Sequence, residues 1–195
     1  MLDFDLAVRV LKGWGGLIAC GLVLGVVNPI LAELPRVPGD RMTTAQIEKG
    51  APAVHPATLY VLAQRLFAEG RKDEAVFWYY VGQLRFRFYL AVNPHLESSG
   101  DPALFSVLSD VVGNPIDRFG FQDPRKLVQT LERVEQWDEE TPNGFTSKEN
   151  NHAVWLEVRE GFKNFIAEVG RTAAATNGAN PSGVATPTPP NEGAP

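Results

Sequence analysis

Residues 75–91 read A-V-F-W-Y-Y-V-G-Q-L-R-F-R-F-Y-L-A, and this stretch decides the fold. Its apolar and aromatic residues occur around nearly the whole circumference of a helix, and such a helix is usually buried on several sides. Asp73 and Glu74 precede it, where carboxylates favour the positive end of the helix dipole, and Asn93-Pro94 follows it as a stop. We therefore predict a central helix over residues 71–91.

Four further helical segments surround this one in the sequence. Pro56 begins the first and Gly70 ends it, while Asp101-Pro102 and Asp123-Pro124 begin the next two, because Pro is compatible with the first turn of a helix. A capping box at residues 146–149 predicts the start of the last. Apolar residues recur at helical spacing, and no stretch alternates as a half-buried strand would. The sequence predicts an all-α fold, a compact bundle of about five helices.

The first 32 residues have the pattern of a targeting segment. Residues 14–27 carry no charge, and the basic residues Arg9 and Lys12 precede them. A basic flank followed by a short apolar core is typical of a secretory signal peptide. We expect residues 1–32 to be a signal peptide cut after Ala32, or an uncleaved membrane anchor.

Cys20, the single cysteine of the chain, leaves a third alternative open. Leu17-Ile18-Ala19-Cys20 resembles the lipobox of bacterial lipoproteins, which would make Cys20 the lipid-bearing residue. In all three cases the protein would be periplasmic or attached to the envelope, and it would meet the membrane only through this N-terminal segment.

The rest of the chain divides by composition. Residues 33–54 are predicted to be an extended linker and residues 55–171 a helical domain without cysteine. Residues 172–195 are nearly uncharged and rich in Pro, Ala, Thr and Gly, so we predict a disordered tail. A net charge of -5 argues against nucleic acid as a partner.

Residues 59–82 resemble one unit of the tetratricopeptide family, or of its relatives with shorter repeats. The resemblance rests on a small-apolar pair, a turn glycine and small or aromatic residues at the expected spacing: Leu62-Ala63, Gly70, Ala75, Tyr79 and Gly82. It implies one helical hairpin. No second copy follows at a period of about 34 residues, so the resemblance does not imply a repeat array.

Two stretches resemble parts of uncharacterised exported bacterial proteins, some of which are encoded beside toxin-delivery systems. These stretches are F-W-Y-Y-V-G-Q-L-R-F-R at residues 77–87 and W-D-E-E-T-P-N-G-F at residues 137–145. The resemblance implies an exported protein. The most specific function that it implies is that of an immunity-type inhibitor of a toxin.

Catalytic and metal-binding motifs are missing from the sequence. The three histidines, His55, His95 and His152, do not occur at a recognised metal-ligand spacing. Nucleophile elbows, phosphate loops and dinucleotide fingerprints are absent as well. We predict no catalytic residue, no cofactor and no metal ion.

Arg85 and Arg87 are the most informative charges. Two positions apart on a helix, they point about 200° from each other, so they cannot both reach solvent from a central helix. At least one should be paired inside the protein, because an unpaired buried charge is very costly. The alternative is that Arg85 or Arg87, together with Gln83, lines a pocket for an acidic group of a partner.

Residues 113–121 are predicted to be a long linker with two aromatic residues and one charge pair. Arg118, Phe119 and Phe121 could contact a partner there, since loops often carry function. The alternative is that the two aromatic rings plug the end of the bundle.

These observations predict a non-enzymatic, exported protein-binding module whose partner is another envelope protein. The second hypothesis is a small hydrolase of envelope or cell-wall substrates. It would use Asp138, or a neighbour in the acidic run at residues 132–140, as acid or base.

Overall fold

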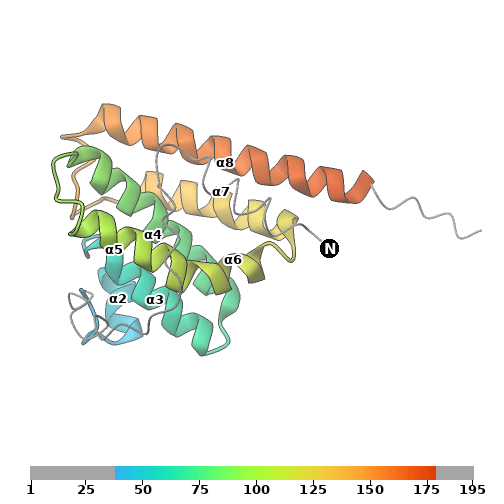
Figure 1. Ribbon diagram of the computed structural model, residues 1–195, viewed down its shortest axis with the longest axis horizontal. Helices are drawn as coiled ribbons and strands as arrows, with labels where there is room; N and C mark the ends of the chain where they lie inside the picture. Colours follow the sequence, from blue (N-terminus) through green and yellow to red (C-terminus); the bar gives the residue numbers. More distant parts are fainter. Residues whose placement is uncertain (1–37, 179–195) are drawn as a thin grey trace, which may run out of the picture.

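The central helix is present as α4, Lys72–Val92. The structure, a computed structural model, describes residues 38–178, and within that range α4 packs against α3 (Pro56–Ala68), α6 (Asn114–Gly120), α7 (Pro124–Glu140) and α8 (His152–Gly178) (Figure 1). Its buried residues lie on all sides of it. The central position predicted from its all-round apolar pattern is confirmed.

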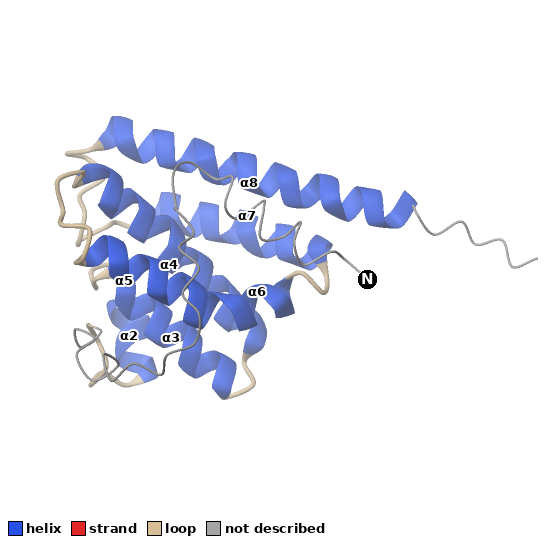
Figure 2. Ribbon diagram, viewed as in Figure 1, coloured by secondary structure: helices blue, strands red, loops and turns tan. Residues whose placement is uncertain are grey.

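The described residues form helices and turns without strands, which confirms the all-α prediction (Figure 2). They contain seven α-helices, because α2 (Thr44–Gly50) and α6 add to the predicted helices, and a π-helical turn, η2 (Ser109–Gly113), follows α5 (Asp101–Leu108). The predicted signal or anchor at residues 1–32 and the tail beyond residue 178 lie outside this range. No helix within it is both long and apolar enough to span a membrane.

Helices α3 and α4 form the predicted hairpin. Gly70 has a φ of 83°, and the Arg71 N–H donates to the Leu66 carbonyl at 2.9 Å, which is the bond that ends a helix at a left-handed residue. A Cβ on Gly82 would lie 3.1 Å from the Tyr60 ring, so glycine lets the two helices approach closely. The likeness to the tetratricopeptide family stays a prediction.

The extended linker predicted at residues 33–54 is wrong for its second half, because α2 lies there. Thr43 and Gln46 form a complete capping box, in which the Thr43 hydroxyl accepts from the Gln46 N–H at 3.2 Å and the Gln46 side chain accepts from the Thr43 N–H at 2.8 Å. Ile47 is fully buried and anchors α2 in the core.

The predicted linker at residues 113–121 is also wrong, because the chain continues from η2 into α6. Pro115 cannot donate a main-chain hydrogen bond, and in an α-helix its ring would clash with the carbonyl of Val111. The wider π turn that ends at Gly113 accommodates this proline, so the chain stays helical through it.

The last helix begins later and ends later than predicted. Residues 146–149 do not cap it: the Asn143 side chain accepts from the Thr146 N–H at 3.0 Å, and α8 begins at His152. At the other end α8 continues to Gly178, so the predicted disordered tail is helical over its first residues. The run Ala173-Ala174-Ala175 explains this extension, because alanine has the highest helix propensity.

Candidate functional site

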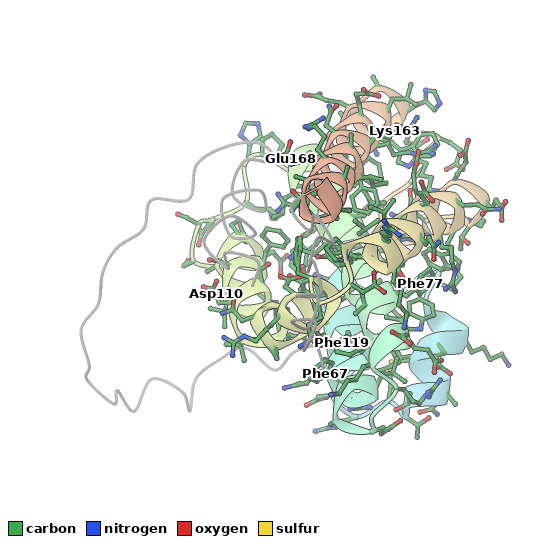
Figure 3. All side chains as sticks on the ribbon, turned by 90° about the vertical axis from the view of Figure 1, so that its right-hand side faces the viewer. Phe67, Phe77, Asp110, Phe119, Lys163 and Glu168 are labelled. Atoms are coloured by element: carbon green, nitrogen blue, oxygen red, sulfur yellow. The ribbon has the colours of Figure 1, made fainter. Side chains whose placement is uncertain are left out.

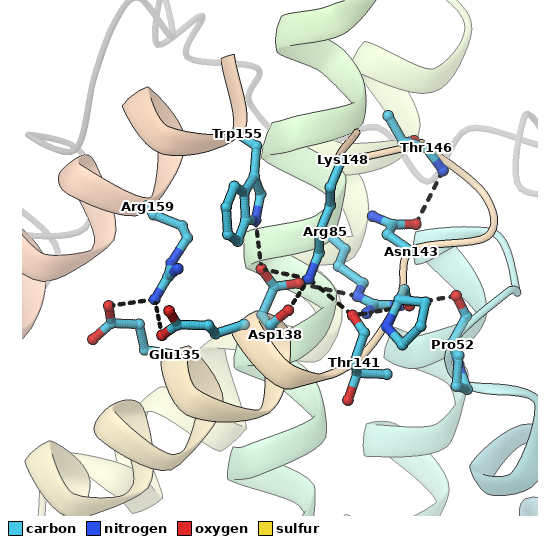
Figure 4. A network of polar contacts seen from close by, with 12 residues as sticks. Pro52, Arg85, Glu135, Asp138, Thr141, Asn143, Thr146, Lys148, Trp155 and Arg159 are labelled. Atoms are coloured by element: carbon cyan, nitrogen blue, oxygen red, sulfur yellow. Dashed lines mark hydrogen bonds and ion pairs between the residues drawn. The ribbon is translucent and has the colours of Figure 1, made fainter. Parts of the chain in front are cut away.

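Arg85, in the middle of α4, is the centre of a buried polar network (Figure 4). It is 2% exposed, and its Nε donates to Oδ1 of Asp138 on α7 at 3.3 Å. Its two terminal nitrogens donate to four main-chain carbonyls at 3.0–3.3 Å, those of Ala51, Pro52, Thr141 and Pro142. Each guanidinium nitrogen therefore has an acceptor inside the protein.

Asp138 also joins this arginine to Lys148, which precedes α8, and to Trp155 on α8. Its Oδ2 accepts from the Trp155 indole N–H at 2.9 Å and lies 3.8 Å from Lys148 Nζ. Lys148 Nζ also donates to the carbonyls of Asp138 and Thr141. Because Asp138 is 2% exposed and both oxygens are engaged, it ties α4, α7 and the start of α8 together.

This geometry decides between the two interpretations of Arg85. Internal pairing is confirmed, and the pocket that Arg85 was to line for a partner is wrong, because the side chain is buried and fully bonded. The carboxylate of Asp138, the candidate acid or base, occupies the same buried network. Burial also lowers the pKa of Arg85 and of Lys148 below their ordinary values, and the nearby Asp138 charge opposes that shift.

A second buried cluster surrounds Asp117 on α6. The Tyr80 hydroxyl donates to its Oδ1 at 2.7 Å, and the Tyr79 hydroxyl lies 3.5 Å from its Oδ2. Gln83 donates to the Tyr79 hydroxyl at 2.8 Å and to the Ser109 hydroxyl at 3.0 Å. No cation among the described residues forms an ion pair with Asp117, and burial raises its pKa to about 7.

Gln83 belongs to this cluster and is 4% exposed, so the prediction that it lines a partner pocket is wrong. Arg87 points the other way, as the helical spacing predicted. Its guanidinium lies 5.1 Å from the Phe105 ring centre on α5, it is half-buried, and burial lowers its pKa. Gln83 and Arg85 therefore do not line an open pocket, and the partner role of Arg87 stays a prediction.

The predicted contact residues of the 113–121 segment lie on or just after α6. Arg118 is exposed, whereas Phe119 and Phe121 are half-buried and pack against the core. The Phe119 ring meets the Phe67 ring edge-on with centres 6.2 Å apart, and Lys72 Nζ lies 5.3 and 5.4 Å from the centres of these two rings. A cation over two partly exposed rings is an arrangement that α3, α4 and α6 build together.

A similar cluster lies between α4 and α7. Phe77, Trp78 and Trp137 are half-buried, their ring centres lie 5.2–6.4 Å apart, and Arg133 lies 5.3 Å from the centre of the Phe77 ring. The guanidinium of Arg85 stacks on Trp137 at 4.4 Å, so the buried network fixes this ring.

We call the two clusters together the aromatic–cationic face, with Phe67, Lys72 and Phe119 as one half and Phe77 and Arg133 as the other. Lys72 and Phe77 are five residues apart on α4 and point about 140° from each other, so the two halves flank the start of that helix. Both of its halves include residues from the first two turns of α4, and a 2.7 Å ion pair between α4 and α7 lies beside them. Figure 3 shows Phe67 and Phe119 next to each other and Phe77 beyond them towards α7.

Sequence analysis identified one residue of this face, Phe119, and missed the other four. Phe67 and Phe77 follow the same helical spacing as core residues, so their partial exposure left no signal in the pattern. The sequence pattern also did not single out Lys72 and Arg133. Each lies over a ring of another helix, and that contact depends on how the helices pack.

The described residues contain no group of three His, Cys, Asp or Glu side chains that could hold a metal ion. A surface hollow of about 610 Å³ lies at α2, lined by Arg41, Met42, Gln46, Lys49 and Gly50, none of which belongs to the aromatic–cationic face. Comparison of the chain with protein-family models, with curated proteins and with solved structures gave no match.

Proposed function

We propose that this chain is a non-enzymatic protein-binding module of the bacterial envelope and that it binds its partner through the aromatic–cationic face. The observation that carries the proposal is the pair of half-exposed ring clusters, each with a cation 5.3–5.4 Å from a ring centre. Aromatic and arginine side chains are enriched at the energetic centres of protein interfaces.

The rigidity of the face supports the same function. Trp137 supports Phe77 and is itself stacked on the buried Arg85, while Phe119 lies two residues after the buried Asp117. A surface whose rings are already fixed loses less conformational entropy when a partner binds. An immunity-type inhibitor, which must bind one toxin tightly, is the narrower form of this proposal.

Site-specific photocrosslinking in the native cell tests the proposal. Benzoylphenylalanine replaces Phe77 in one variant and Phe119 in another, which keeps an aromatic group at each position. The control carries it at Leu156, which is 48% exposed on α8 and outside the face. We expect the same protein adduct from positions 77 and 119 and none from position 156. Absence of an adduct at both face positions would overturn the proposed function.

A further inference from the structure

The two cations of the face are available to a partner. Lys72 and Arg133 form no ion pair within the described part of the chain, although many other exposed cations do. Arg71, for example, contacts three glutamates, and Lys126 pairs with Asp73. The exposed Arg41, Lys49 and Arg125 are also unpaired within the described residues, but of these five cations only Lys72 and Arg133 lie over aromatic rings.

We propose that the partner presents an acidic polypeptide segment with apolar anchor residues to the aromatic–cationic face. This inference rests on the proposed function, and it names the chemistry of the partner at the same site. Carboxylates would pair with Lys72 and Arg133, and the neighbouring apolar side chains would meet the exposed edges of Phe67, Phe77 and Phe119.

The chemistry of each cation fits a carboxylate. The planar guanidinium of Arg133 can bind both oxygens of one carboxylate, and it is weakly hydrated, so its position above the Phe77 ring costs little. Lys72 provides a compact charge that two rings flank. An ion pair beside an apolar ring is partly shielded from water, which strengthens it relative to a fully exposed pair.

A nucleic acid is the other polyanion that such cations could bind. Glu69 and Asp73 near the start of α4 are 50% and 59% exposed, and each is paired with a basic side chain. Lys72 and Arg133 are therefore separate positive sites and not part of a continuous basic strip that a phosphate backbone could follow. A polypeptide can place its few carboxylates opposite the cations alone, and for this reason we assign the face to an acidic polypeptide.

The test uses full-length protein with benzoylphenylalanine at position 77. One variant adds Lys72→Glu and Arg133→Glu, and a second adds Lys72→Gln and Arg133→Gln as a milder change. The matched control adds Lys49→Glu, because Lys49 is exposed on α2 and outside the face. Thermal unfolding of each variant shows whether it is folded.

We expect the adduct to fall at least ~10-fold in the glutamate variant, to fall less in the glutamine variant and to stay unchanged in the control. If both face variants give as much adduct as the protein without these substitutions, the inference that the partner segment is acidic is overturned. The proposal that the face binds a protein would still stand. A nuclease-sensitive adduct would assign the face to nucleic acid instead. Equal loss in the Lys49→Glu control would show a general charge effect and overturn the local assignment.

Discussion

Arg85 and Asp138 form an ion pair of 3.3 Å between Nε and Oδ1, and their side chains are only 2% and 3% exposed. The pair joins positions 53 residues apart, and it connects the central helix α4 to the last turn of α7. Four main-chain carbonyls, Lys148 and Trp155 complete it. The network therefore fixes Trp137, whose ring contacts Phe77 of the aromatic–cationic face.

Asp138→Asn should lower the free energy of unfolding by about 3–5 kcal/mol. The change leaves Arg85 and Lys148 buried without a compensating negative charge, and breaking a buried ion pair has a cost of this order. Urea unfolding at neutral pH measures the loss. Glu132→Gln is the matched control, since it removes an exposed carboxylate from the same helix and should change stability by less than ~0.5 kcal/mol. Equal stabilities of the two variants would contradict this role of Asp138.

The sequence predicted that at least one of the two central arginines is internally paired, but it could not identify the acceptor groups. The five acceptor groups come from three separate parts of the chain: residues 51–52, Asp138 and residues 141–142. Four of them are main-chain carbonyls, which every residue possesses, so no side-chain pattern announces them. The acidic run around Asp138 was visible, yet only packing distinguishes this buried carboxylate from its exposed neighbours.

Gly113→Ala should destabilise the protein by about 1–3 kcal/mol. A Cβ at this position would lie 2.3 Å from the Tyr79 hydroxyl, and Tyr79 is held in place by burial and by its bond from Gln83. Overpacking of this kind has a cost of the stated order. Gly170→Ala on α8 is the control, because its Cβ would meet nothing within 4 Å. That change should stabilise the helix by about 0.5–1 kcal/mol, and thermal unfolding of both variants tests the contrast.

The long helices were predictable because their apolar periodicity is sustained over several turns. The short helices were not. Helix α2 has seven residues and only Ile47 is buried among them, so the capping box at Thr43 and Gln46 was its one local sign. Helix α6 was hidden by Gly113 and Pro115, which normally break helices, because the compensating π turn cannot be recognised from residue types.

Residues 1–40, fused to a reporter that is active only outside the cytoplasm, should give an active reporter. The expectation rests on the uncharged stretch at residues 14–27 behind Arg9 and Lys12. Mass spectrometry of the mature protein distinguishes the alternatives, because cleavage after Ala32 would leave Glu33 as the first residue. A lipid-modified Cys20 would instead indicate a lipoprotein. A silent fusion would refute export, and a Lys12→Glu fusion should show reduced activity.

Asp117 makes the free energy of unfolding depend on pH. Its carboxyl group is buried among tyrosine hydroxyls, and burial raises its pKa from the ordinary value of 3.8 to about 7. Between these two values the folded protein retains a proton that the unfolded chain has released. The stability that this carboxyl group contributes is therefore complete below pH ~4 and is lost as the pH rises to ~7.

Asp117→Asn should gain stability relative to the unchanged protein as the pH increases from about 4 to about 8. Asparagine cannot ionise and its side-chain carbonyl can still accept from the Tyr80 hydroxyl, so the variant avoids the cost of burying a charge. The difference in unfolding free energy between the two proteins should shift by up to about 4 kcal/mol in favour of the variant. Urea unfolding at four pH values across this range measures it, and Asp110→Asn, at an exposed position on η2, provides a control with no such trend. A difference that stays constant with pH would show that Asp117 is ionised in the folded protein throughout the range.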